Sequence, residues 1–491
     1  MTARLQNPGR TQGDPALSRR DFGQLLVGAT AAAAVPLILP ARLLGAEAPS
    51  NRLRVGQVGC GRIAQVHDVP AVLKAGSADY VAVCDLDSRR AADSKEQIAA
   101  FYRKSGGVAP DVRVYSNYRE LLAHPDLDAV VISTPDHWHA QLVAAAVLAG
   151  KDVYVQKPFT MTVAEGKLLR DLVAKTGRIV QVGSQQRSTP QFRLACELVR
   201  SGRIGQVRRV EIGLPIDPTQ PDDPRQPVPP NLQYDEWLGS TPQVYYTEQR
   251  VHPQKGYSRP GWLRNESFCL GMITGWGSHH YDTMHWALNT ELSGPGRVEA
   301  RADFPHNKIW NVHGAYQVDL TYPGDVRVSV SDKHPNGLKF IGTEGWIWVT
   351  REGQTTASDP SSPGTALPPL DASDHRLLIP EGLSVQLPRS DEHHRNWLES
   401  IRSRREPIAP ARIAHRSGSA CIVSWIAMKL GRPVNWDVRA EKFVNDSQAD
   451  ALLARHERSP YGVQHLVGEQ KWQPTSKEVA ANLAASAGVS A

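Results

Sequence analysis

The stretch that decides the fold is L-R-V-G-Q-V-G-C-G-R-I-A, residues 53–64. Its first half is a short apolar run typical of a buried strand, and the pattern G-x-G-x-x-A begins at Gly59. A helical stretch follows to about Gly76, and the apolar run 80–84 predicts a second strand. Glycines between a strand and a helix allow a tight turn and a close approach of pyrophosphate to the helix N-terminus. The stretch therefore predicts a dinucleotide-binding unit, against the alternative of a plain structural turn.

An acidic residue ends the second predicted strand. Asp85 stands 26 residues after Gly59, where a carboxylate can accept hydrogen bonds from both hydroxyls of an adenosine ribose. The same carboxylate repels a 2′-phosphate, so Asp85 favours NAD over NADP. Arg89 and Arg90 lie close enough to keep NADP as the alternative.

Strands and helices continue to alternate after Asp85. Further strands are predicted near residues 112–115, 129–134, 152–155 and 179–182, and helices near 88–104, 118–124, 137–149 and 164–176. This rhythm predicts an α/β fold with a doubly wound parallel sheet. Ligands of such sheets bind beyond the carboxyl ends of the strands, which directs attention to residues 133–139, 156–158 and 183–187.

Five segments together resemble one family, the glucose–fructose oxidoreductase, inositol dehydrogenase and rhizopine catabolism (Gfo/Idh/MocA) family. They are V-G-C-G-R-I-A (58–64), V-C-D-L-D (83–87), T-P-D-H-W-H-A (134–140), G-K-D-V-Y-V-Q-K-P (150–158) and G-W-G-S-H-H-Y-D (275–282). The resemblance implies an N-terminal Rossmann domain followed by an α/β domain with a large, open, mainly antiparallel sheet. We expect the first domain at residues 49–187, the second, for substrate binding and oligomerisation, at 188–472, and a flexible tail at 473–491.

Later segments agree with that expectation. Strands are predicted over 208–214, 298–304, 314–322, 326–332 and 345–350, and a helix over 412–430. Seven prolines within residues 215–230 predict an irregular crossing segment. Residues 357–369 are rich in Ser, Pro and Gly and predict a surface loop.

The resemblance also implies a cofactor site. Its expected residues are Gly59, Gly61, Arg62, Ile63, Asp85, Thr134, Pro135, His137, Trp138, His139, Gln156, Lys157 and Gln185.

For catalysis, the family carries Glu-Lys-Pro and D-x-x-x-H. Here the first reads Gln156-Lys157-Pro158, and Lys157 is expected to hold and polarise the reacting hydroxyl, since an ammonium stabilises a developing alkoxide. His279 is expected to take the hydroxyl proton. Alignment on His279 puts Gly275 where the family's aspartate stands, and we expect Asp282, three residues later on the same helical face, to support the histidine instead.

A polar, aromatic cleft is expected around the substrate, because sugars stack their CH faces on rings. The candidate substrate-binding residues are Arg187, Trp262, Arg264, Trp276 and His280. His279, His280, Asp282 and His285 also have spacings that suit a metal. A helix that lines a sugar pocket explains them without one, so no metal is predicted.

The N-terminus predicts an export signal. Residues 18–22 read S-R-R-D-F, and twenty uncharged residues separate Asp21 from Arg42. A twin arginine before a weakly apolar, alanine-rich segment resembles a twin-arginine (Tat) signal over residues 1–48. The alternative, a membrane anchor, is disfavoured by the alanine content. We therefore expect a periplasmic or secreted protein without stable membrane insertion.

Composition excludes other classes. The first 46 residues hold five arginines and two aspartates, which is half of the formal net charge of +6, so the remaining chain offers no basic stripe for nucleic acid. Five scattered cysteines without a C-x-x-C pair predict neither a disulfide framework nor a zinc site.

Three functions remain open from these residues. The first is an exported oxidoreductase that keeps NAD(H) bound and acts on a sugar, glycoside or cyclic polyol. The second is a redox-neutral, NAD-dependent enzyme that cleaves glycosides by transient oxidation at C3, elimination and hydration. The third is a catalytically reduced subunit that binds a sugar or a partner enzyme. The resemblance implies a homo-oligomer, a dimer or a tetramer.

Overall fold

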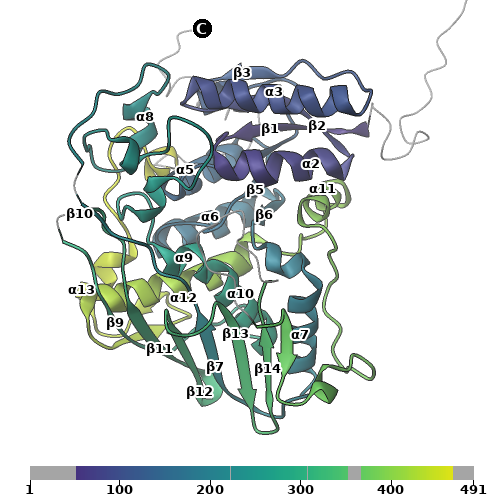
Figure 1. Cartoon of the computed structure of the whole chain (residues 1–491), viewed down its shortest axis with the longest axis vertical. Coiled ribbons are helices and arrows are strands. Elements are labelled where there is room, and N and C mark those ends of the chain that lie inside the picture. Colours follow the sequence, from purple (N-terminus) through teal and green to yellow (C-terminus); the bar gives the residue numbers. More distant parts are fainter. Residues whose placement is uncertain (1–50, 222, 307, 352–366, 468–491) are drawn as a thin grey trace, which may run out of the picture. The chain divides into compact units, whose positions relative to one another are not determined.

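The first half of the chain forms a parallel sheet of six strands in the order β3-β2-β1-β4-β5-β6 (Figure 1). This computed structural model describes residues 51–221, 223–306, 308–351 and 367–467. The strands are β1 (Leu53–Val58), β2 (Ala78–Cys84), β3 (Arg113–Tyr115), β4 (Ala129–Ile132), β5 (Asp152–Val155) and β6 (Val180–Val182). The helices between them are α2 (Val69–Ala75), α3 (Ser88–Lys104), α4 (Tyr118–Leu122), α5 (Asp136–Leu148) and α6 (Val163–Thr176). The predicted doubly wound α/β sheet is confirmed.

Local chemistry explains where these elements begin and end. Asp87 caps α3 by accepting hydrogen bonds from the backbone N–H groups of Arg89 and Arg90. Thr162 and Glu165 form a reciprocal capping box at the start of α6. The apolar runs of β4 and β5 are buried on both faces, as parallel strands covered by helices on each side must be.

The second half forms a nine-stranded sheet in the order β15-β14-β13-β7-β12-β11-β9-β16-β17. Its central pair, β7 and β12, is parallel and every other pair is antiparallel. The strands are β7 (Val207–Gly213), β9 (Arg297–Ala302), β11 (Tyr316–Tyr322), β12 (Val326–Ser331), β13 (Gly337–Gly342), β14 (Trp346–Val349), β15 (Leu370–Ala372), β16 (Val434–Asp437) and β17 (Lys442–Phe443). A large, mainly antiparallel sheet is thus confirmed, although β13 was not predicted because a glycine at each end masks its short apolar run.

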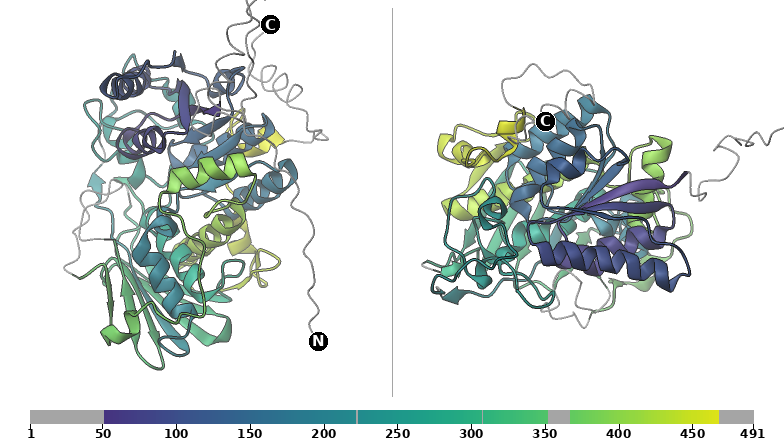
Figure 2. Two further views of the ribbon diagram at one scale, coloured as in Figure 1. Left: turned by 90° about the vertical axis from the view of Figure 1, so that its right-hand side faces the viewer. Right: turned by 90° about the horizontal axis from the view of Figure 1, so that it is seen from above.

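Helices cover one face of this sheet. They are α7 (Pro190–Arg200), α9 (Met272–Gly275), α10 (Gly277–Leu288) and α12 (Ala411–Leu430). Along β11, Val318 and Leu320 are buried whereas Asp319 is exposed, so the other face is polar. Figure 2 shows the helices on one side of the sheet only. Because α12 packs against both β9 and α6, the same helix joins the two sheets into one unit.

Three segments outside the two sheets reach the first domain. Residues 231–262, which include α8 (Tyr234–Leu238), cross over the turn between β2 and α3. Near the C-terminal side, α13 (Ser447–Asp450) precedes α14 (Val463–Val467), and α14 packs on α5. The third segment contains α11 (His393–Ser403), which lies in sequence between residues 231–262 and α13 and packs on α2. These crossings bring residues far apart in sequence to the carboxyl ends of the parallel strands.

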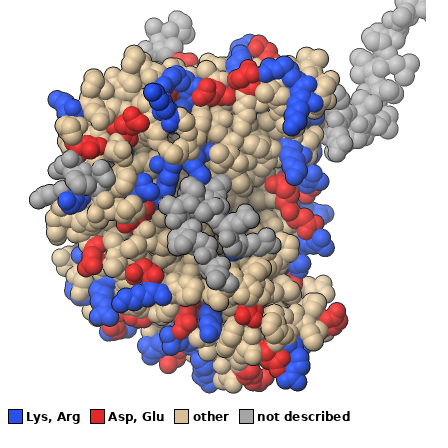
Figure 3. All heavy atoms as spheres, in the orientation of Figure 1, with Lys and Arg blue, Asp and Glu red and all other residues tan. Residues whose placement is uncertain are grey.

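Two further observations concern the surface and the ends of the chain. Among the described residues, no helix has both the length and the apolar character needed to span a bilayer. On the face seen in Figure 3, Lys and Arg are interspersed with Asp and Glu. The predicted signal segment, the tail at 473–491 and most of the loop at 357–369 lie outside the described residues. The predicted boundary at residue 187 stays a prediction.

Candidate functional site

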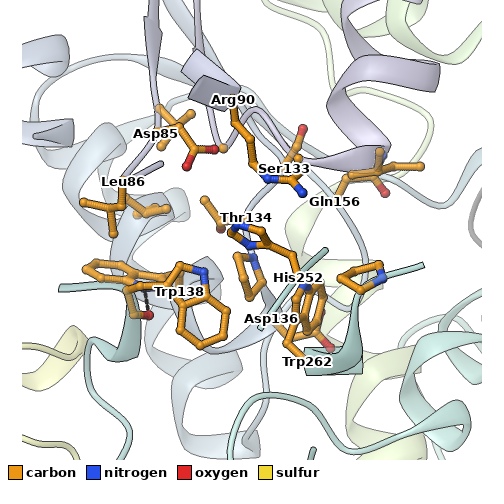
Figure 4. A pocket seen from close by; sticks show the side chains of 18 of the residues that line it. Asp85, Leu86, Arg90, Ser133, Thr134, Asp136, Trp138, Gln156, His252 and Trp262 are labelled. Atoms are coloured by element: carbon orange, nitrogen blue, oxygen red, sulfur yellow. Dashed lines mark hydrogen bonds between the residues drawn. The ribbon is translucent and has the colours of Figure 1, made fainter. Parts of the chain in front are cut away.

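A cavity of about 520 Å³ opens at the carboxyl ends of the parallel strands. Its size lies within the range of ligand pockets. Both halves of the chain line it: the turn and strand ends of the first domain on one side, residues 258–263 and 272–276 on the other. Figure 4 shows Asp85 and Arg90 on one side of this space and Trp138 and Trp262 on the other.

Most of the predicted cofactor residues line the cavity. They are Gly59, Gly61, Arg62, Ile63, Asp85, Thr134, Pro135, Trp138, Gln156 and Lys157. Trp262 and Trp276, predicted for the substrate, line it as well, and so does Gly275.

The glycine turn has the shape that a dinucleotide requires. Gly59 has φ +82°, and a Cβ there would stand 2.8 Å from the backbone of Ser133 and Thr134. A side chain is therefore excluded at Gly59 both by conformation and by space. At Gly61 a Cβ would meet nothing within 4 Å, which leaves room for a phosphate beside the turn. The residues present thus fit a bound dinucleotide.

Asp85 stands where a ribose would lie. Its carboxylate accepts hydrogen bonds from the backbone N–H of Cys60 at 2.6 Å and of Asp87 at 2.8 Å. Burial raises the pKa of Asp85, and these two hydrogen bonds oppose the rise. Each oxygen accepts one backbone bond and keeps a second lone pair, which suits a pair of ribose hydroxyls.

Residues 231–262, here called the strap, hold the turn after β2 from outside. The backbone N–H of Gln233 donates to the carbonyl of Leu86 at 3.0 Å, and that of Ser88 donates to Asn231 at 2.9 Å. His252 Nε2 lies 3.1 Å from a carboxylate oxygen of Asp87. The sequence did not predict the strap, because its contacts are backbone hydrogen bonds to a distant loop and leave no periodic pattern.

Aromatic rings close the same end of the cavity. The indole N–H of Trp138 donates to the carbonyl of Trp237 in the strap at 3.0 Å. The ring of Trp138 also lies 5.9 Å from that of Tyr461 and 6.0 Å from that of Tyr118. Tyr461 belongs to the segment that precedes α14, so the strap and the C-terminal segment meet over Trp138.

A buried ion pair holds Gln156 in the cavity wall. The π-helical turn η3 (Ala64–Asp68) ends in Asp68, whose carboxylate lies 3.1 Å from His394 Nε2 of α11. Hydrogen bonds from His394 and His67 hold the pKa of Asp68 well below its usual range against the effect of burial, and Asp68 and Glu392 raise the pKa of His394 to about 9.

Gln156 donates its side-chain N–H to both oxygens of Asp68, at 2.8 and 3.0 Å. The amide is thus used as a donor. A glutamate here, as in the family motif, would put a second carboxylate against the buried Asp68, and two adjacent like charges disfavour ionisation. The structure therefore gives a physical reason for Gln156.

Asp136, which was not among the predicted residues, lines the cavity near Lys157. Burial raises the pKa of Asp136 to about 8, and the positive charge of Lys157 opposes this rise. The available signal was its place at the carboxyl end of β4, directly after Pro135. A carboxyl group that ionises near neutral pH beside a lysine is typical of acid–base sites.

His279 lies on α10, is buried and does not itself line the cavity, although its neighbours Gly275 and Trp276 do. Its Nδ1 has no hydrogen-bond partner among the described residues. Burial holds the pKa of His279 well below its usual range, and the charges of Arg351 and Lys157 act in the same direction. The neutral imidazole is therefore favoured, and its protonation is disfavoured. A Cβ at Gly275 would meet nothing within 4 Å, so the position of the family's aspartate is open space.

Asp282 does not support His279 as expected. Its two carboxylate oxygens accept hydrogen bonds from Arg187 at 2.6 and 2.9 Å, and Arg187 also donates to Glu291 at 2.9 Å. Both partners of the pair are buried, and neither lines the cavity. Asp282 points toward the 3-10 turn η4 (Gln185–Ser188) that carries Arg187, so Arg187 is a structural partner and not a wall of the cleft.

Five further predicted residues also lie away from the cavity lining. In each case a protein partner explains the position: His137 contacts the carbonyl of Trp237, His139 the carbonyls of Pro158 and Thr134, Gln185 the hydroxyl of Tyr154, His280 the amide of Asn336, and Arg264 the carboxylate of Asp217. Their polar groups are used in packing, which the motif alone does not reveal.

The histidines of α10 do not gather as metal ligands. His285 Nε2 lies 2.8 Å from the hydroxyl of Tyr322, and His280 Nε2 lies 2.9 Å from Asn336. Within the described ranges, the group with the composition of a metal site is His67, Asp68 and His394. Hydrogen bonds from Gln156 and Ser133 already occupy that carboxylate.

Comparison with known proteins agrees with this geometry. Residues 53–184 match a family model described as an oxidoreductase family with an NAD-binding Rossmann fold, and residues 219–352 and 377–463 match the model of its C-terminal α/β domain.

Two curated relatives and one solved structure are examples of the proteins to which this chain is similar. The scyllo-inositol 2-dehydrogenase (NAD(+)) of Bacillus subtilis is 25% identical over 404 residues, 79% of this chain and 98% of the relative. The uncharacterised oxidoreductase ORF334 of Rhizobium meliloti is 34% identical over 161 residues, 32% of this chain and only 44% of the relative. The structure of an aldose–aldose oxidoreductase from Caulobacter crescentus, complexed with glycerol, has a TM-score of 0.54 at 18% identity and covers 78% of this chain and 99% of that one.

Proposed function

Since the chain belongs to the Gfo/Idh/MocA family of NAD-binding oxidoreductases, we propose that it oxidises a hydroxyl group of a sugar, glycoside or cyclic polyol and keeps its cofactor bound between turnovers. The observation that carries this proposal is one cavity lined by the dinucleotide turn at Gly59, by Lys157 and by Gly275–Trp276. The inositol dehydrogenase among the relatives supports a polyhydroxylated substrate.

The residues that would hold NAD are the Gly59–Gly61 turn for the pyrophosphate, Asp85 for the ribose, and Trp138 with Tyr461 at the aromatic end. When bound, NAD supplies a hydride acceptor. The buried Asp68–His394 pair fixes Gln156 in the wall beside it.

Proton transfer falls to three side chains of the chain itself. Lys157 donates to the reacting oxygen and stabilises the charge that develops there. His279 accepts the hydroxyl proton, as a weak base, because burial lowers its pKa. Asp136, whose pKa is raised to about 8 by burial, can exchange a proton with Lys157 near neutral pH.

The strap supports the proposal that the cofactor is retained. Trp237 of the strap and Tyr461 of the C-terminal segment both line the cavity and contact Trp138, so they would lie against a bound dinucleotide and oppose its release. A retained cofactor must be reoxidised in place, which calls for a second acceptor molecule in each cycle.

A redox-neutral reaction is the second candidate, and the open space at Gly275 favours it. Such an enzyme would cleave a glycoside and return the hydride to the sugar.

A single turnover of the NAD-loaded protein separates the two candidates. The oxidoreductase would accumulate NADH, seen by its near-ultraviolet absorbance, and stall until a ketosugar or another acceptor is added. Acceptor-free cleavage of a glycoside, with solvent deuterium at C2 of the sugar, would instead establish the redox-neutral reaction. Binding of a sugar without either outcome would leave the catalytically reduced subunit.

Export through the Tat route is part of the proposal, and it rests on Arg19 and Arg20. Replacement of both arginines by lysine should keep the protein in the cytoplasm, as fractionation would show. Unchanged export of that variant would contradict the proposed Tat route. A homo-oligomer, dimer or tetramer, is proposed on the family resemblance and is tested by light scattering.

A further inference from the structure

Three side chains beside Gly275 each keep a buried polar atom without a hydrogen-bond partner among the described residues. These atoms are Nη2 of Arg351, Nε1 of Trp276 and Nδ1 of His279. The three side chains are neighbours, because the guanidinium of Arg351 lies 4.9 Å from the ring centre of Trp276 and the rings of Trp276 and His279 are 6.1 Å apart. Buried polar groups in folded proteins are normally satisfied, so such a cluster points to a missing ligand.

Arg351 also lacks a counter-charge. Within the described part of the chain no carboxylate pairs with it, and burial lowers its pKa to about 10. The contrast with Arg187 is direct, because that buried guanidinium contacts both Asp282 and Glu291. A partly buried cation without an anion is costly, and the cost falls when a ligand brings the anion.

Room for such a ligand exists in the same place. Gly275 has no atoms within 4 Å in the direction of a Cβ, and both Gly275 and Trp276 line the cofactor cavity. On the other side of the cluster, Arg351 lines a second hollow together with Gln185 and Gln186. The position where the family has an aspartate is thus both empty and adjacent to an uncompensated positive charge.

We infer that the substrate is a sugar acid, whose carboxylate is bound by Arg351 and Trp276 while its reacting hydroxyl faces Lys157 and His279. This inference rests on the proposed function and deepens it, since it names the substrate class. The guanidinium presents a planar fork of donors that matches a carboxylate. The indole nitrogen is a donor only, so the ligand must supply acceptors.

Two other ligand chemistries fit less well. A neutral sugar would offer hydroxyl oxygens to the donors but would leave the charge of Arg351 without a counter-ion. A sugar phosphate carries close to two negative charges at neutral pH, whereas the cluster beside Gly275 contains one cationic side chain, Arg351. A single carboxylate is the ligand that balances the site.

Binding to the NADH-loaded protein tests the inference without turnover. Calorimetry compares D-glucuronate with D-glucose, D-galacturonate with D-galactose, and both acids with D-glucose 6-phosphate. At least one acid should bind roughly ten- to a hundredfold more tightly than its neutral counterpart, as expected for a charge-assisted contact. Equal affinity for each acid and its neutral partner would overturn the inference, and so would a preference for the phosphate.

Variants of Arg351 assign the effect to this side chain. Arg351→Gln should lose the preference for the acid, so that each acid and its neutral counterpart bind with similar affinity, whereas Arg351→Lys should keep part of the preference because the charge remains. Arg389→Gln is the matched control, because Arg389 lines the same hollow but is exposed and paired with Asp391. Retention of the preference in Arg351→Gln would disprove the role of Arg351.

The two proposals fail in distinguishable ways. If the acid binds through Arg351 but never reduces the bound NAD, the sugar-acid site stands and the oxidoreductase does not. If a neutral sugar reduces the cofactor as rapidly as the acid does, the oxidoreductase stands and the sugar-acid site does not. Cofactor content, measured in every variant by absorbance after denaturation, shows that a loss of binding is not a loss of folding.

Discussion

The two ends of the cavity differ in how their residues were found. At the cofactor end, Gly59, Asp85 and Thr134 lie where the motif predicts them, on turns that leave the carboxyl ends of strands. At the substrate end, the motif of α10 predicts Asp282 and His280, and both are turned into protein contacts. A residue at a strand end points into a ligand cleft by topology, whereas each residue of a helix faces a direction set by packing.

The two ends of the cavity also differ in whether their polar residues serve ligand binding or the stability of the fold. At the cofactor end, polar atoms are held ready for a ligand by backbone bonds, as at Asp85. Around α10, charged side chains such as those of Arg187 and Asp282 are paired with each other inside the protein. Substitutions at the two ends should therefore change different measured quantities, a rate or an affinity at one end and the free energy of unfolding at the other.

The largest effect is expected from Lys157→Ala. Loss of the group that stabilises the developing alkoxide should slow the single-turnover reduction of bound NAD by about 10²–10⁴-fold. Rapid mixing with substrate, followed by NADH absorbance, measures this rate. Lys167→Ala, on the exposed face of α6, is the control and should be silent. A normal rate in Lys157→Ala would move the chemistry away from this end of the cavity.

Asp282→Ala should act on stability. Removal of one partner of the buried pair leaves Arg187 with Glu291 as its remaining carboxylate and should lower the free energy of unfolding by up to about 3–5 kcal/mol, with an unchanged rate per folded molecule. Urea titration measures the first quantity and active-site counting the second. Asp391→Asn removes an exposed ion pair and should leave the free energy of unfolding nearly unchanged. A stable but inactive Asp282→Ala protein would show that Asp282 has a catalytic role, and would contradict the division between the two ends of the cavity.

Asp85→Ala should weaken NAD binding by about 1.5–3 kcal/mol, roughly ten- to a hundredfold, because a charge-assisted bond to the ribose is lost. NADP should lose much less, since the carboxylate that repels its 2′-phosphate is gone. Equilibrium dialysis with both cofactors measures the two changes, and Asp111→Ala, an exposed position in the same domain, is the control. Equal losses for NAD and NADP would contradict a ribose contact.

The smallest effect concerns pH and the Asp68–His394 pair behind the cofactor end. The pKa of His394 is raised to about 9 in the folded protein, so its stabilising contribution is complete below its ordinary pKa and is lost as the pH rises through 9. The pKa of Asp68 is lowered in the folded protein, so the stabilising contribution of Asp68 is lost when the pH falls far enough to protonate it.

Comparison of wild type with His394→Gln isolates this pair. Between about pH 6 and pH 10 the wild type should lose on the order of 1–3 kcal/mol more unfolding free energy than the variant. Urea titrations at both pH values measure the difference. Parallel pH profiles in the two proteins would show that the pair contributes no ionic stabilisation.

Sequence alone predicts the fold and one wall of the site. The predicted helix at 88–104 and the strands at 53–58 and 152–155 have the observed bounds, because each has a clear period and a cap or glycine at its ends. Asp136 could have been predicted as a site residue, because it follows the carboxyl end of β4. Arg351 and the strap could not, because each depends on contacts across more than 70 residues of sequence, such as Arg351 with Trp276 and Gln233 with Leu86.

Tyr461 in the wall of the cavity has a consequence for the order of events in the cell. A ribosome releases the chain from its N-terminal end, so the Gly59 turn emerges long before the aromatic end of the site can close. The wall at this end of the cavity is complete only once residue 461 has emerged and packed on Trp138. A product truncated before Tyr461 would therefore lack part of the cavity wall, although its dinucleotide turn is intact.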